Sequence, residues 1–85
     1  MGAPTLLAIT GELDLHTASR LPERLARNPS IRILDLSGVS FIDPAGLRIV
    51  LDVIRADPQL VVRAASACVR RLCAIAGLDD LTTPP

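Results

Sequence analysis

The chain has 85 residues, enough for one domain and too few for two. Its apolar content is 49% and its mean hydropathy is +0.43, yet its uncharged apolar stretches run for only a few residues, whereas a membrane-spanning helix needs about 18. Nine arginines balance nine acidic residues, no lysine occurs, and Phe41 is the sole aromatic residue. Because the sequence lacks both a basic stripe and stacking aromatic rings, nucleic acid is not an expected partner.

Three short apolar runs predict the strands of the fold. They are TLLAIT at 5–10, IRILDL at 31–36 and LVVRAA at 60–65. The segments between them have helical periodicity. This alternation predicts an α/β domain in which helices pack on a small sheet.

The first helix is predicted over about 18–28, and its start has two candidate positions. With Thr17 as the N-cap, Pro22 would fall in the helix interior and remove a backbone hydrogen bond. With Ser19 as the N-cap, Pro22 would lie in the first turn, where its missing N–H costs nothing. We favour Ser19, or an irregular first turn.

The second helix is predicted from Pro44, with Asp43 as its N-cap, to a stop at Asp57. On the side opposite its apolar stripe, charged residues recur at spacings of three and four and can pair with one another; they are Arg48, Asp52 and Arg55.

The third helix is predicted over about 67–76, with Ser66 as its N-cap and Gly77 as a left-handed stop. The tail at 82–85 is expected to fray. Cys68 and Cys73 are five residues apart on this helix, a spacing that turns their side chains away from each other, so we interpret both as small core residues.

No catalytic or cofactor-binding motif is found in the sequence. It contains no glycine-rich phosphate loop, no recognisable pair of catalytic carboxylates and no nucleophile beside a base, and His16 is its sole histidine. We therefore expect no enzyme activity, no metal and no cofactor. No charged segment followed by an apolar one stands at the N-terminus, which predicts a cytoplasmic protein without a secretory signal.

Two loops are predicted where the first two strands end, at 11–18 and at 41–47. This edge of an α/β sheet is where functional loops gather.

The sequence resembles the STAS domains, and most closely the bacterial anti-sigma-factor antagonists, in three segments: ITGELDLHTA at 9–18, IRILDLSGVSFIDPAGL at 31–47 and CVRRLCAIAGLDDL at 68–81. Their order and spacing agree with the family over residues 5–81. The resemblance implies a single STAS domain over 1–85, with a small mixed β-sheet and about three to four helices. In the family a further strand precedes the one that ends in GELD, so here the first edge strand is expected to be absent or short.

The resemblance also implies a partner switch in sigma-factor regulation. In the family the unmodified domain binds an anti-sigma factor of the histidine-kinase-like ATPase type, and phosphorylation of a Ser or Thr directly after the Asp breaks that complex. Here Pro44 occupies the acceptor position and Ala45 follows it. Neither residue has a hydroxyl group, so we expect no phosphorylation switch at this position.

Carried over residue by residue, the resemblance implies a partner-binding surface that comprises Asp14, Asp43, Pro44, Ala45, Gly46 and Arg48. The residues themselves leave other roles open. Asp43 can serve as a helix cap alone, and Asp14 can be a turn-forming residue. Gly46, costly in a first helical turn, indicates a close backbone approach by either the neighbouring loop or the partner.

Two further expectations complete the sequence analysis. A STAS subunit of a transport or signalling-scaffold assembly is the alternative function, which genomic neighbours would distinguish from sigma-factor regulation. A missing edge strand would leave the edge at 5–10 open, which favours pairing with a second copy of the chain.

Overall fold

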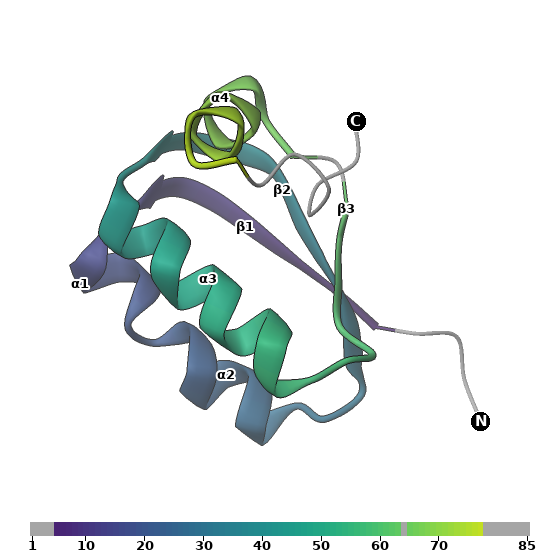
Figure 1. Cartoon of the computed structure of the whole chain (residues 1–85). Coiled ribbons are helices and arrows are strands. Elements are labelled where there is room, and N and C mark those ends of the chain that lie inside the picture. Colours follow the sequence, from purple (N-terminus) through teal and green to yellow (C-terminus); the bar gives the residue numbers. More distant parts are fainter. Residues whose placement is uncertain (1–4, 64, 78–85) are drawn as a thin grey trace.

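The structure is a computed structural model, and it describes residues 5–63 and 65–77. Within these residues, three strands form a sheet of order β1-β2-β3, and four helices connect or follow them (Figure 1). The strands are β1 (Thr5–Leu13), β2 (Ile31–Ile42) and β3 (Val61–Arg63). The helices are α1 (Leu15–Ala18), α2 (Leu21–Arg27), α3 (Pro44–Ala56) and α4 (Ala67–Ile75).

The predicted α/β class is confirmed, and every strand pairing among the described residues is parallel. Parallel neighbours need a crossover connection, which α1 with α2 and then α3 provide. A strand that would make the sheet mixed is not among the described residues.

The core lies between the sheet and the helices. Leu34 and Leu36 of β2 are fully buried, as is Val69 of α4. On the other face of the sheet, Leu6 is 37% exposed and Val61 is 53% exposed. The helices therefore cover one face of the sheet, and the opposite face carries no described element.

The first two strands are longer than the sequence predicts. β1 continues through Leu13 and β2 through Ile42, so all the residues expected in loops before Asp14 and Asp43 are strand residues. Register shifts between Ala8 and Thr10 and again after Gly11 insert extra residues, and Gly11 adopts a φ of 83°. Each shift interrupts the ladder locally, and the pairing resumes beyond it as far as Leu13 and Ile42.

The first predicted helix is two helices, and neither candidate cap was right. Asp14 caps α1, and its side chain accepts a hydrogen bond from the N–H of Thr17. Arg20 occupies the N-cap position of α2 without a side-chain cap. The predicted location of Pro22 in a first turn is confirmed, because it lies at the start of α2.

The later helices begin where the sequence predicts. Asp43 caps α3, and Asp57 is its C-cap. Ser66 is the N-cap residue of α4 by position, although its side chain makes no capping hydrogen bond, and Gly77 has the expected left-handed φ of 74°. The predicted frayed tail at 82–85 lies outside the described residues.

The structure also tests two smaller expectations, on the cysteines and on the charged residues of the second predicted helix. Cys73 is buried, whereas Cys68 is half-buried and its thiol donates to the Val39 carbonyl (3.2 Å). The charged residues of α3 lie on its exposed side, but within the described residues no ion pair joins Arg48 or Arg55 to Asp52. None of the described helices is long and apolar enough to cross a membrane.

Candidate functional site

The candidate site forms where β1 and β2 end side by side. Leu13 is paired with Ile42 in the parallel register, and each strand is followed at once by an aspartate that starts a helix. The N–H of Asp43 donates to the carbonyl of Leu13 (3.3 Å). The sheet therefore brings the two predicted segments, around Asp14 and Asp43, into direct contact.

Asp43 has its carboxylate engaged in capping α3. The N–H of Gly46 donates to Oδ1 of Asp43 (2.7 Å), and the N–H of Leu47 donates to its backbone carbonyl (3.0 Å). Pro44 takes the first helical position, where its missing N–H costs no hydrogen bond. Capping is thus one role of Asp43 that the geometry shows directly.

Asp14 forms a reciprocal capping box with Thr17. Oδ1 of Asp14 accepts from the N–H of Thr17 (2.8 Å), while the Asp14 N–H donates to Oγ1 of Thr17 (2.9 Å). The Thr17 hydroxyl also donates to the carbonyl of Glu12 (2.7 Å). The hydrogen bond from the Thr17 backbone to the Asp14 carboxylate, followed by one from the Thr17 hydroxyl (3.1 Å), holds the pKa of Asp14 below its usual value.

Gly46 is buried beneath the turn that follows β1. A Cβ atom at this position would overlap the carbonyl oxygen of Leu13 and lie 2.7 Å from its carbonyl carbon. Of the two alternatives that the sequence leaves open, the structure therefore shows the neighbouring loop as the group that approaches Gly46. The side of Gly46 on which a Cβ would stand is filled by this turn.

Apolar and basic side chains are among those that this end of the molecule presents to solvent. Pro44 and Arg48 are exposed, and Ala45 is half-buried. Sequence reasoning missed two exposed apolar neighbours, Leu15 at 63% and Phe41 at 47%. The exposure of Phe41 could have been predicted from its place next to Ile42. Successive residues of a strand face opposite sides of the sheet, so when Ile42 enters the core Phe41 points away from it.

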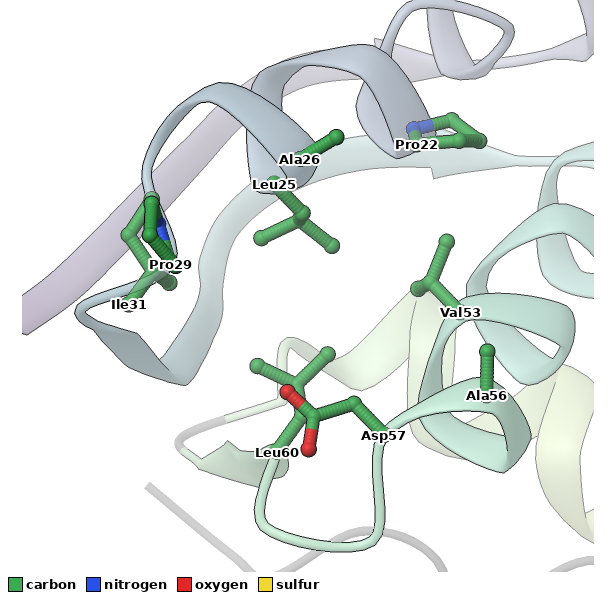
Figure 2. A pocket seen from close by; sticks show the side chains of 9 residues that line it. All are labelled: Pro22, Leu25, Ala26, Pro29, Ile31, Val53, Ala56, Asp57 and Leu60. Atoms are coloured by element: carbon green, nitrogen blue, oxygen red, sulfur yellow. The ribbon is translucent and has the colours of Figure 1, made fainter.

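The described residues offer no metal centre, since no group of three or more His, Cys, Asp or Glu side chains lies close enough to hold an ion. A pocket of about 270 Å³ lies at the opposite end of the helical layer, between α2 and α3. Figure 2 shows the side chains of Leu25 and Val53 reaching into it from α2 and α3, and Asp57 and Leu60 also line it. It is separate from the Asp14–Asp43 site.

The structure is a small α/β domain. Its crossover helices cover one face of a parallel sheet, and two capped helix starts meet at the end of that sheet. The sequence model of the family described as "Mlab, STAS domain" matches residues 1–83, and the chain belongs to this family. It is 37% identical over 81 residues to the anti-sigma-F factor antagonist RsfB of Mycobacterium tuberculosis, in two strains. That match covers 87% of this chain and 66% of the relative, so the chain spans just under two thirds of the curated relatives' length.

A solved structure agrees with the fold. The unphosphorylated form of the anti-sigma factor antagonist SpoIIAA superimposes with a TM-score of 0.72 over 94% of this chain and 77% of that one. The sequences are 19% identical in this comparison, which establishes the shared fold.

Proposed function

We propose that the chain is a non-catalytic, protein-binding regulator that acts as an anti-sigma-factor antagonist. The observation that carries the proposal is the 37% identity to RsfB, an anti-sigma-F factor antagonist, over 87% of the chain. The fold shared with SpoIIAA, a second antagonist, supports it. The partner would be an anti-sigma factor of the histidine-kinase-like ATPase type, and the proposed location is the cytoplasm.

The proposed contact surface surrounds the start of α3. Pro44 and Arg48 are exposed there, and Leu15 and Phe41 add apolar area that a partner can cover. Asp14, Asp43 and Gly46 would act mainly by fixing the two turns, because the first two are engaged as caps and the third is buried.

Binding of the partner is proposed to be constitutive, in the sense that no phosphorylation at the start of α3 regulates it. A phosphate at the start of α3 would add negative charge and acceptor oxygens to the contact surface, which is how a modification there would break a complex. Pro44 and Ala45 have no hydroxyl group to accept the phosphate. The kinase activity of the partner would therefore leave this surface unchanged.

The test combines a binding titration with intact-mass analysis. The purified chain is titrated with the anti-sigma factor of its own cell, and then incubated with that protein and ATP. We expect wild type to bind and to remain unmodified over 41–47, and Pro44→Ser to gain a phosphate and lose affinity. Pro44→Ala is the matched control, because it removes the proline without supplying a hydroxyl. Absence of binding by wild type would refute the proposed function, and a phosphate elsewhere that abolishes binding would refute constitutive binding.

A further inference from the structure

The pocket between α2 and α3 (Figure 2) is a feature that the proposed function does not use. Its volume is about 270 Å³, and the buried side chains of Ile31, Val53 and Leu60 line it. Protein interiors leave few voids larger than a water molecule, so a hollow of this size among core residues needs a physical cause. Two of its lining residues, Ala26 on α2 and Ala56 on α3, have short side chains that leave the space between the helices unfilled.

The pocket can be reached from solvent and is large enough for a small molecule. Pro22 and Ala26 from α2 and Ala56 from α3 line it and are exposed. An apolar cavity of about 150 Å³ holds benzene. A pocket of about 270 Å³ therefore has room for a single ring, or a branched chain of similar size, with a short substituent. In such pockets a small number of polar groups fix the orientation of the ligand.

The polar group of this pocket is the carboxylate of Asp57. Of the nine described residues that line the pocket, Asp57 alone carries a charge, and it is half-buried. Its Oδ1 accepts a hydrogen bond from the N–H of Gln59 (3.0 Å). A carboxylate can accept about four such bonds, so acceptor capacity remains for a ligand. Asp57 is also the C-cap of α3, where the helix dipole adds partial negative charge. The electrostatic potential on this side of the pocket thus favours a cation.

We propose that this pocket binds a small alkyl or aryl amine, a molecule with an apolar body and a primary ammonium group. The apolar body fills the space that Leu25 and Val53 line, and the ammonium group donates to the carboxylate of Asp57. A carboxylic acid of the same size is repelled by Asp57, and a neutral molecule lacks the stronger hydrogen bond that a charged donor makes. The pocket lies away from the proposed contact surface, so this inference does not depend on the proposed function.

The experiment compares two probes of nearly the same shape. Benzylamine is a ring with a short ammonium substituent, and benzyl alcohol is its neutral counterpart. Each is titrated into the isotope-labelled full chain, and amide chemical shifts report both the affinity and the location of the ligand. We expect benzylamine to shift the amides of Leu25, Val53, Ala56 and Asp57, and to bind about three- to tenfold more tightly than benzyl alcohol.

Two pairs of variants separate the role of charge from the role of space. Asp57→Asn keeps an acceptor for the N–H of Gln59 but removes the charge, and it should bring the two affinities within about twofold of each other. Its matched control is Asp52→Asn, at an exposed position of α3 that does not line the pocket, which should keep the preference for the amine. Ala56→Leu fills the pocket and should lose the binding of both probes, whereas Ala74→Leu on α4 should retain it.

Four results would overturn the proposal. They are absence of benzylamine binding, amide shifts located away from the pocket, equal affinities of wild type for the two probes, and a preference for the amine that survives in Asp57→Asn. Each of them leaves the proposed function untouched, because no anti-sigma factor takes part in the titration.

Discussion

Gly46 lets the two turns of the site touch, because it has no side chain where the Leu13 carbonyl lies. Gly46→Ala is expected to cost about 3 kcal/mol of folding free energy or more, since the clash is with backbone that cannot rotate away. The control is Gly77→Ala, which meets no atom within 4 Å and costs about 1–2 kcal/mol through its left-handed φ alone. Urea unfolding measures both. Equal costs for the two variants would contradict the close approach at Gly46.

Asp14 gives the stability of the protein a specific dependence on pH. Its pKa is lowered from the usual 3.8, chiefly by the hydrogen bond from the Thr17 backbone. A carboxyl group whose pKa is lower in the folded state contributes stability above about pH 4, and this contribution is lost as pH falls through the lowered pKa. Asp14→Asn keeps an acceptor but cannot ionise. The stability difference between wild type and Asp14→Asn, from unfolding curves, should be constant at pH 5–7 and shrink below pH 4. A stability difference between wild type and Asp14→Asn that stays constant down to pH 3 would contradict this prediction.

At the scale of single residues, the sequence predicted the cap at Asp43 and the close approach at Gly46, because proline at the first helical position and glycine in a first turn each have a local physical cause. It did not decide between the roles of Asp14. The capping box of Asp14 depends on a four-residue helix, which is too short to show any periodicity. The exposure of Leu15 depends on the same helix, so it was equally hidden.

At the scale of elements, boundaries set by strong local signals were predictable and those set by tertiary contacts were not. Asp57 and Gly77 end α3 and α4 as expected. The extension of β2 to Ile42 depends on its pairing with β1 and on bulges in that pairing, and neither is visible in one segment alone. The pair of charged residues predicted at Arg48 and Asp52 failed for a related reason, because exposed ion pairs add too little energy to fix two long side chains.

The helices α2 and α3 leave the pocket of Figure 2 between them, and filling it should stabilise the protein. Ala56→Leu places a larger apolar side chain at its wall while keeping a good helix former. The expected gain is about 0.5–2 kcal/mol, or a rise in Tm of roughly 2–16 °C, measured by thermal unfolding. Ala74→Leu, at an exposed position of α4 that lines none of the pockets described here, is the control. A Tm that rises equally in both variants would show that helix propensity and not packing is responsible.

At the scale of the whole molecule, the α/β class followed from the alternation of strands and helices, and the crossovers then place the helices on one face. The sequence could not show how much of the opposite face of the sheet these helices leave uncovered. Leu6, Ile33 and Val61 are paired in register across all three strands on the outer face, and no described helix covers them. β1 is an edge strand whose outer side has no partner among the described residues.

The outer side of β1, unpaired among residues 5–63 and 65–77, leads to the last prediction, that the chain tends to dimerise through β1. Two β1 strands related by a two-fold axis can pair antiparallel, so that three strands from each copy form one sheet and their apolar rows become continuous. Light scattering should show a molar mass that rises toward the dimer value with concentration. Ala8→Lys, at an exposed position of β1, should abolish the rise, because a lysine on an edge strand opposes pairing. Val61→Lys places the same charge on the short strand β3 at the other edge and should leave the dimer intact. A monomer mass at every concentration, or a dimer that Ala8→Lys does not disturb, would contradict pairing at this edge.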